Sequence, residues 1–293
     1  MGVIAQPFGY LLKILYELFG NYGWALVFFT ILVNLLMLPL TIKQQKSTAN
    51  MQKIQPLIAE VQKKYQYDKE KQSQELMKVY QQHNINPMGG CLPLLIQLPI
   101  ILLLYQVITK PLTYMYNLNT DLINELKTLL GFAPDAIVQE ITLAQKLTPE
   151  ILQMPHFSHL PLIDFNFYGL DLGATPSFSV FNALWLIPIL AALTSYLLTH
   201  LTMKQNGQSN NTQDNPTVAS MNTMNKIMPL ISAWVTFSFP AGIGLYWIMS
   251  NVVRMAQQIF LNYYFKKSDN SDPLVIEKDS SNKSQKGKKG KKK

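Results

Sequence analysis

The only arginine in this chain, Arg254, lies in an apolar stretch, 243–263, that is long enough to cross a membrane. A guanidinium group cannot lose its proton, so it keeps its charge even in hydrocarbon. Placing that charge near the centre of a bilayer costs at least about 2.5–3.5 kcal/mol. The apolar stretches contain no acidic residue that could pair with it. We therefore expect Arg254 to face water or to bind an anion inside the membrane.

Polar and aromatic side chains accompany Arg254 on one face of the helix that this stretch predicts. At about 100° per residue, the opposite face is almost wholly apolar and suits contact with lipid. Other apolar stretches also carry polar residues, which need a common interior or a water-filled cavity. We expect a hydrated groove lined by Arg254, Asn34, Thr30, Gln97, Thr199, Tyr246, Trp247, Ser250, Asn251 and Gln257.

Two other interpretations of these residues stay open. Hydrogen bonds between helices would account for the serines and threonines, at about 0.6 kcal/mol each. Arg254 could instead extend its side chain toward the cytoplasmic headgroups. Neither interpretation requires a cavity.

The composition is too apolar for an ordinary soluble domain, since 48% of the 293 residues are hydrophobic and 14% are charged. We expect an all-α membrane protein with five transmembrane helices around a polar groove, a cytoplasmic helical hairpin and an N-terminal amphipathic interfacial helix. The expected segments are 1–22 (outer-surface helix), 23–42 (span 1), 43–86 (cytoplasmic hairpin), 90–109 (span 2), 110–177 (outer loop), 178–201 (span 3), 202–223 (cytoplasmic loop), 224–240 (span 4), 243–263 (span 5) and 264–293 (disordered basic tail).

The charges of the connecting segments predict an orientation. Segment 43–86 carries eight lysines against four acids, whereas 110–177 carries three lysines against seven acids. The tail carries ten lysines and four acids. Lysine-rich segments stay in the cytoplasm, so we expect the N-terminus outside and the C-terminus inside the plasma membrane.

The two lysine-rich segments suggest partners. The hairpin 43–86 is too polar to bury a core of its own, and it is either a solvated spacer or a docking surface for a ribosome, a targeting factor or an incoming chain. The tail 264–293 could bind ribosomal RNA or anionic lipids, or it could simply aid solubility and fix the topology. In the outer loop, His156 and His159 are too few to indicate a metal site.

Three blocks of sequence resemble the YidC insertase family, the bacterial branch of the Oxa superfamily. The first is Leu38-Pro39-Leu40 followed by Lys43-Gln44-Gln45-Lys46-Ser47 and Met51. The second is the long and specific run Asn86-Pro87-Met88-Gly89-Gly90-Cys91-Leu92-Pro93-Leu94-Leu95-Ile96-Gln97-Leu98-Pro99-Ile100. The third is Phe239-Pro240-Ala241-Gly242, then Leu245-Tyr246-Trp247-Ile248-Met249-Ser250-Asn251 and Gln257-Gln258. The resemblance is to the Gram-positive type.

The resemblance implies a membrane protein insertase and chaperone, not an enzyme. The family has five core spans around a groove that is open to the cytoplasm and to lipid but closed toward the outside. Its substrates are nascent single-span or few-span membrane proteins, handled alone or with the Sec translocon and the signal recognition machinery. We expect no cofactor, and no Gly-Lys-Ser/Thr phosphate-binding loop occurs in the chain.

The chain departs from the family at the groove arginine. That residue usually lies five positions before the Pro-Leu pair, where this chain has Asn34. The family's polar residue on the third core span corresponds to Thr199. Asn34 lies eleven residues after Gly23, and Arg254 lies eleven after Ile243. Both would therefore lie about 16 Å below the outer boundary. We hypothesise that the groove charge has moved from the first span to the fifth.

An alternative function is a small anion transporter or channel that uses Arg254. Transporters often contain internal repeats, and none is evident in this sequence. A third possibility is a structural assembly factor without insertion activity.

Overall fold

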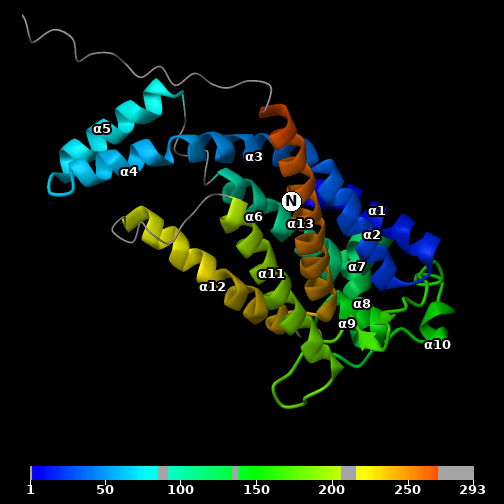
Figure 1. The fold of residues 1–293 in the computed structure, drawn as a ribbon. Helices are drawn as coiled ribbons and strands as arrows, with labels where there is room; N and C mark the ends of the chain where they lie inside the picture. The colour runs from blue at the N-terminus through cyan, green and yellow to red at the C-terminus, as the bar shows by residue number, and fades with distance from the viewer. Residues whose placement is uncertain (1, 85–91, 134–137, 206–215, 270–293) are drawn as a thin grey trace, which may run out of the picture. The chain divides into compact units, whose positions relative to one another are not determined.

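The computed structural model describes residues 2–84, 92–133, 138–205 and 216–269, and it is mostly helical, as expected (Figure 1). The elements in chain order are α1 (Gly2–Phe19), α2 (Tyr22–Leu36), α3 (Leu38–Lys53), α4 (Gln55–Lys64), α5 (Lys69–Gln82), α6 (Leu92–Thr109), α7 (Pro111–Tyr116), α8 (Thr120–Leu129), α9 (Glu140–Gln145), α10 (Pro149–Leu152), β1 (Asn166–Phe167), β2 (Leu170–Asp171), the 3-10 helix η2 (Ala183–Trp185), α11 (Leu186–Gln205), α12 (Pro216–Ser238) and α13 (Ala241–Asp269).

Two compact units make up the chain, Met1–Ala256 and Gln257–Lys293, and the division falls within α13. Most of the predicted basic tail lies outside the described residues, and so does the side chain of Gln97.

By length and composition, one described helix can cross a membrane, Ala183–Lys204. A second candidate is the pair Tyr22–Leu36 and Leu38–Met51, if the 54° bend between its halves belongs to a single span. A shorter apolar helix covers Ile227–Ser238. The mostly helical architecture is thus confirmed, and the arrangement of five spans stays a prediction.

Asn21 determines where α2 begins. Its side-chain oxygen accepts hydrogen bonds from the amide nitrogens of Gly23 (3.0 Å) and Trp24 (3.3 Å). These amides have no partner within the helix, so an asparagine at this position stabilises the helix end. The hydroxyl of Tyr22, fully buried, donates a 2.8 Å hydrogen bond to the carbonyl of Ile108 and ties α2 to α6.

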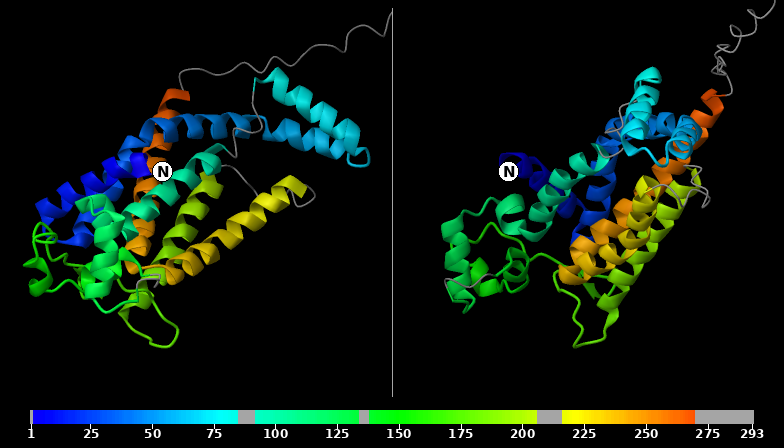
Figure 2. Two further views of the ribbon diagram at one scale, coloured as in Figure 1. Left: turned by 180° about the vertical axis from the view of Figure 1, so that it is seen from behind. Right: turned by 90° about the vertical axis from the view of Figure 1, so that its left-hand side faces the viewer.

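The segment predicted as an outer loop is folded into helices α7 to α10 and a short hairpin of β1 and β2 (Figures 1 and 2). Side chains from this segment and from α1, α2 and α6 are fully buried together in one apolar core. The core includes Leu12, Phe29, Leu104, Leu126, Ile141 and Phe157. The core therefore lies where the outer segment meets the helices.

A buried carboxylate joins α9 to α7. Glu140 accepts hydrogen bonds from the amide nitrogen (2.8 Å) and the hydroxyl (2.6 Å) of Thr113, which lies in the first turn of α7. Acidic groups are favourable at this end of a helix because its amide groups point outward.

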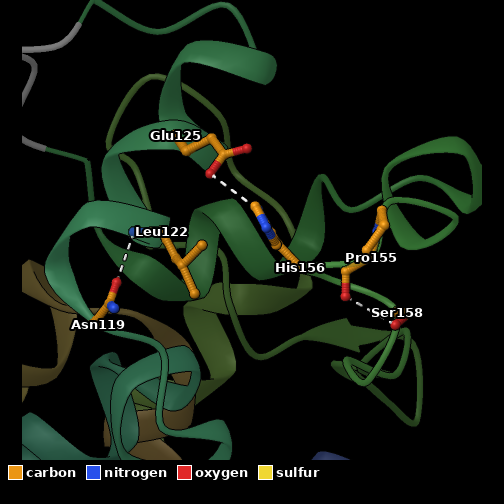
Figure 3. A network of polar contacts seen from close by, with 6 residues as sticks. All are labelled: Asn119, Leu122, Glu125, Pro155, His156 and Ser158. Carbon is orange, nitrogen blue, oxygen red and sulfur yellow. Dashed lines mark hydrogen bonds and ion pairs between the residues drawn. The ribbon is translucent and has the colours of Figure 1, made fainter.

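The exposed side of the outer segment is held by local contacts, which Figure 3 shows. The side-chain oxygen of Asn119 caps α8 by accepting from the Leu122 amide at 2.9 Å. His156 faces Glu125, with 3.7 Å between Nδ1 and the nearer carboxylate oxygen, and both side chains are exposed. Among the described residues, no group of three or more His, Cys, Asp or Glu side chains could hold a metal ion.

Helices α4 and α5 pack against each other as an antiparallel pair (Figure 1). Asp68 caps α5 by accepting from the Lys71 amide at 3.0 Å. The side chain of Gln72 donates a 2.9 Å hydrogen bond to the carbonyl of Gln62. No residue of α5 is buried, so the pair depends on few apolar contacts.

Helices α11 and α12 form the most extensive helix pair in the described part of the chain (Figure 2). Their outward surfaces are apolar and exposed, including Leu186, Ile189, Leu193, Leu230 and Trp234. In a membrane such surfaces face lipid.

Candidate functional site

The polar face of α13 divides into two stripes of residues four apart. One stripe consists of Tyr246, Ser250 and Arg254, and the other contains Trp247 and Asn251. Residues four apart lie on the same side of a helix. The two stripes have different partners, so the single face predicted from the sequence makes two separate sets of contacts in the structure.

The first stripe contains the arginine. The side chains of Tyr246 and Ser250 are buried. Arg254 is partly buried and lies close enough to Tyr246 to interact with it electrostatically. Among the described residues, no carboxylate forms an ion pair with Arg254.

The second stripe holds three helices together. The side-chain amide of Asn251 donates to the hydroxyls of Thr194 (3.1 Å) and Ser195 (2.9 Å) on α11. The indole nitrogen of Trp247 donates to Ser195 at 3.4 Å, and Ser195 donates to Ser232 on α12 at 2.8 Å. These side chains follow the pattern of hydrogen bonding between helices, the alternative raised from the sequence.

On α2, the two expected groove residues bond to their own helix. The hydroxyl of Thr30 donates to the Leu26 carbonyl (2.7 Å), and the amide of Asn34 donates to the Thr30 carbonyl (2.8 Å). Both side chains are buried. Such bonds satisfy the side-chain donors within the helix.

The remaining expected groove residues lie apart from this group or cannot be placed against it. Thr199 is half-buried on α11, one turn beyond Ser195. The side chain of Gln97 is outside the described part of α6. Gln257 belongs to the second unit, where it is half-buried.

Sequence reasoning missed the segment that positions α2 and α13, the strap Leu162–Ala174. Its Asp164 carbonyl accepts a 3.0 Å hydrogen bond from the Tyr22 amide, the first amide of α2. Its Leu172 carbonyl accepts a 2.7 Å hydrogen bond from the Gly242 amide, near the start of α13. Carbonyl groups of one segment thus cap the beginnings of both helices.

The strap also makes side-chain contacts that require close approach. The side-chain amide of Asn21 donates to the Asn166 carbonyl (2.7 Å) and to the Asp164 carboxylate (3.0 Å). A Cβ atom at Gly23 would lie 2.2 Å from the ring of Phe167, so only glycine fits there.

Asn34 and Arg254, two of the residues expected to line a groove, lie at matching distances from the strap. Asn34 lies twelve residues after Tyr22, and Arg254 lies twelve residues after Gly242. At 1.5 Å per residue each lies about 18 Å along its own helix from the amide that the strap caps.

A sequence model described as 60Kd inner membrane protein matches residues 14–268, which is most of the chain. The chain belongs to this family. A relative from Caldanaerobacter subterraneus subsp. tengcongensis, named membrane protein insertase YidC, is 31% identical over 88% of this chain and 93% of its own length. A relative of the same name from Clostridium perfringens is 33% identical over 84% of this chain and 81% of its own length.

Other members of the 60Kd inner membrane protein family are longer. A relative from Nitratidesulfovibrio vulgaris, also named membrane protein insertase YidC, is 30% identical over 88% of this chain, which spans only 38% of that relative. A crystal structure described as an active YidC insertase with its first transmembrane domain resolved is 26% identical, with a TM-score of 0.49, and the match covers 89% of this chain and 46% of that chain.

Proposed function

We propose that this protein is a membrane protein insertase of a bacterial plasma membrane, with nascent membrane proteins as substrates and lipids as surroundings. The relatives that carry this name match the chain over most of its length and, in two cases, over most of theirs. The observation that carries the mechanism is Arg254, a partly buried cation without a carboxylate partner among the described residues, on an otherwise largely apolar stretch of α13.

We propose that the stripe of Tyr246, Ser250 and Arg254 faces a hydrated groove, with Thr30 and Asn34 as its neighbours. Gln97, Thr199 and Gln257 complete the proposed lining. Trp247 and Asn251 contribute indirectly, because their hydrogen bonds to α11 fix the rotation of α13 and therefore the direction of the first stripe.

The groove lowers the cost of moving a polar segment across hydrocarbon. A segment that starts in water partway through the membrane has a shorter apolar path to cross. The Arg254 cation attracts an acidic outer segment of the substrate. The apolar helix of the substrate then moves into lipid, driven by the burial of its surface at about 25 cal/mol per Å². Nucleotide hydrolysis is not needed.

We propose that the strap closes the groove on the outer side. It bonds to α1 through Tyr16, to α2 through Tyr22 and to α13 through Gly242, in each case by hydrogen bonds of 2.7–3.1 Å. A segment fixed to three helices at one end of the bundle leaves the opposite end free to admit substrate. This assignment needs the N-terminus outside and the tail in the cytoplasm.

Further partners follow from the lysine-rich segments. We propose that the ribosome binds the helix pair α4 and α5 and the basic tail. We also propose that the protein cooperates with the Sec translocon and the signal recognition machinery. The strong excess of lysine in the tail suits a polyanionic partner.

Purified protein in lipid vesicles tests the function. A single-span substrate with a short acidic outer segment is added, and the fraction protected from external protease is measured against protein-free vesicles. Protection that depends on the protein supports an insertase. Flux of chloride through the same vesicles without substrate protection would instead support the anion transporter.

A further inference from the structure

A short loop between the strap and α11 exposes large apolar side chains outside the helices. Phe178 is 80% exposed, Phe181 is 83% exposed and Val180 is 58% exposed. Exposed aromatic residues grouped in this way mark a surface that contacts something else. The loop lies at the ends of α11 and α12 (Figure 2). The ring of Phe178 lies against that of Phe237, with 3.9 Å between centroids and 33° between the ring planes.

Several polar groups of the loop are paired within the loop or with Trp185. The indole nitrogen of Trp185 donates to the carbonyls of Ser177 (3.1 Å) and Val180 (3.3 Å). Ser177 and Val180 also pair as an antiparallel bridge, and the Ser177 hydroxyl accepts from the Ser179 amide at 3.2 Å. A backbone whose polar groups are paired internally can enter an apolar environment at low cost.

Charge is excluded from the same region. No Asp, Glu, Lys or Arg occurs from Leu172 to Met203, although the outer segment before this point carries seven acids. The acidic residues of the outer segment thus end at Asp171, immediately before the loop region. A protein partner in water would ordinarily be met by a rim of polar and charged residues, whereas a lipid surface calls for none.

The apolar surface of the loop continues onto a membrane span. Ala183–Lys204, the helix that can cross a membrane by itself, begins two residues after Phe181. Its side chains Leu186 and Ile189 are exposed, at 51% and 55%. The hydrocarbon layer of a bilayer is about 30 Å thick, and a helix needs about 20 residues to cross it. The 22 residues of this helix are therefore just enough to span the layer, and the loop that precedes it lies at the boundary with the headgroups.

We propose that the loop 175–182 is a lipid anchor that embeds Phe178, Val180 and Phe181 in the outer boundary of the bilayer. Phenylalanine side chains on interfacial segments bury at the boundary between headgroups and acyl chains, and tryptophans such as Trp185 are enriched at this level. The hydrogen bonds that Trp185 donates to the loop hold it against the ends of α11 and α12. The anchor therefore fixes the outer end of this helix pair in the membrane. This assignment rests on α11 crossing the bilayer with the segment before it outside, and it is independent of the groove.

A fluorescent reporter tests the anchor. Ser179→Cys, in a Cys91→Ser background, is labelled with an environment-sensitive dye and reconstituted at low protein density in vesicles of phosphatidylcholine and phosphatidylglycerol. The reference is Asp121→Cys on the exposed side of α8. Quenching is measured with a lipid that carries a nitroxide near its headgroup and with iodide in water.

The anchor predicts that the Ser179 reporter is quenched several-fold more by the nitroxide lipid, and several-fold less by iodide, than the Asp121 reference. Adding Phe178→Ser and Phe181→Ser should shift the reporter toward the behaviour of the reference. The vesicles contain no other protein, so a Ser179 reporter as open to iodide as the reference would overturn the proposal and indicate a protein partner instead. Loss of folding in the double variant would leave the first comparison decisive.

Discussion

The amide nitrogen of Gly242 lies 2.7 Å from the carbonyl oxygen of Leu172, and this hydrogen bond joins the start of α13 to the strap. The corresponding bond on α2 runs from the Tyr22 amide to the Asp164 carbonyl at 3.0 Å. Two helices far apart in the chain are therefore aligned by one short segment. A Cβ atom at position 242 would lie 3.3 Å from the same oxygen, so glycine permits the approach.

Removing the cap of α2 should loosen the strap. Asn21→Ala deletes the bonds to Gly23 and Trp24 and the bonds to the strap. We expect a loss of about 1–2 kcal/mol in the free energy of unfolding, the upper part of the range for an N-cap. The midpoint of thermal unfolding in detergent measures the change.

A matched control separates capping from strap contact. Asn119→Ala removes the cap of α8, an asparagine for which no bond to the strap is seen in the structure. We expect the two variants to lose similar stability, but only Asn21→Ala should let a water-soluble thiol reagent added outside reach a cysteine placed at Thr30. Equal protection of that cysteine in both variants would contradict a sealing role for the strap.

The second stripe of α13 should contribute to stability rather than to substrate handling. Ser195→Ala removes the shared partner of Trp247, Asn251 and Ser232. Hydrogen bonds between membrane helices are worth about 0.6 kcal/mol each, and about 1.7 at most, so we expect a loss of roughly 1–2 kcal/mol with insertion largely retained.

The control for this variant is Ser238→Ala, because Ser238 is exposed and, within the described part of the chain, its hydroxyl bonds only to the Trp234 carbonyl of its own helix. It should leave unfolding unchanged. If Ser195→Ala abolished insertion while keeping its stability, the serine would belong to the groove instead.

Much of the local structure follows from sequence patterns. Segments 121–130 and 149–154 have the composition of short helices, and α8 and α10 lie there. Asp68 caps α5, and an aspartate before a helical run is a common signal for a helix start. These features depend on residues a few positions apart, and a single sequence contains that information.

The strap could not be predicted because its partners are distant in the chain. Asn21 and Asp164 are 143 positions apart, and β1 and β2 have only two residues each, too few for an alternating pattern. The outer segment contains six prolines, a composition typical of a loop, whereas burial of Ile141 and Phe157 shows a packed core. The helical wheel located the polar face of α13 but could not separate it into two stripes. The separation depends on hydrogen-bond partners on α11, which the sequence of α13 does not contain.

Glu140 should make stability depend on pH. Burial raises the pKa of Glu140, while the hydrogen bonds from Thr113 oppose the rise. With a pKa above its unfolded value, the folded protein binds more protons. The contribution of this group to stability is therefore fully present below the ordinary pKa of a glutamate and is lost as pH rises through the raised pKa.

Glu140→Gln tests this directly. Glutamine has the shape of the protonated acid and can both accept from the Thr113 amide and donate to its hydroxyl. We expect the variant to gain stability relative to the wild type as pH rises from about 4 to 8, measured by thermal unfolding. Glu125→Gln, at an exposed position, is the control. A difference between wild type and Glu140→Gln that stays constant with pH would contradict the assignment.

The insertion yield of a single-span substrate in vesicles tests the central claim, that the groove charge of this chain is carried by Arg254 on α13 at the level of Asn34 on α2. The comparison is between wild type, Arg254→Ala and the double variant Asn34→Arg, Arg254→Ala. We expect Arg254→Ala to lower the yield about tenfold, as a loss of about 1.4 kcal/mol of attraction would, and the double variant to recover most of it. Normal insertion by Arg254→Ala would contradict the account.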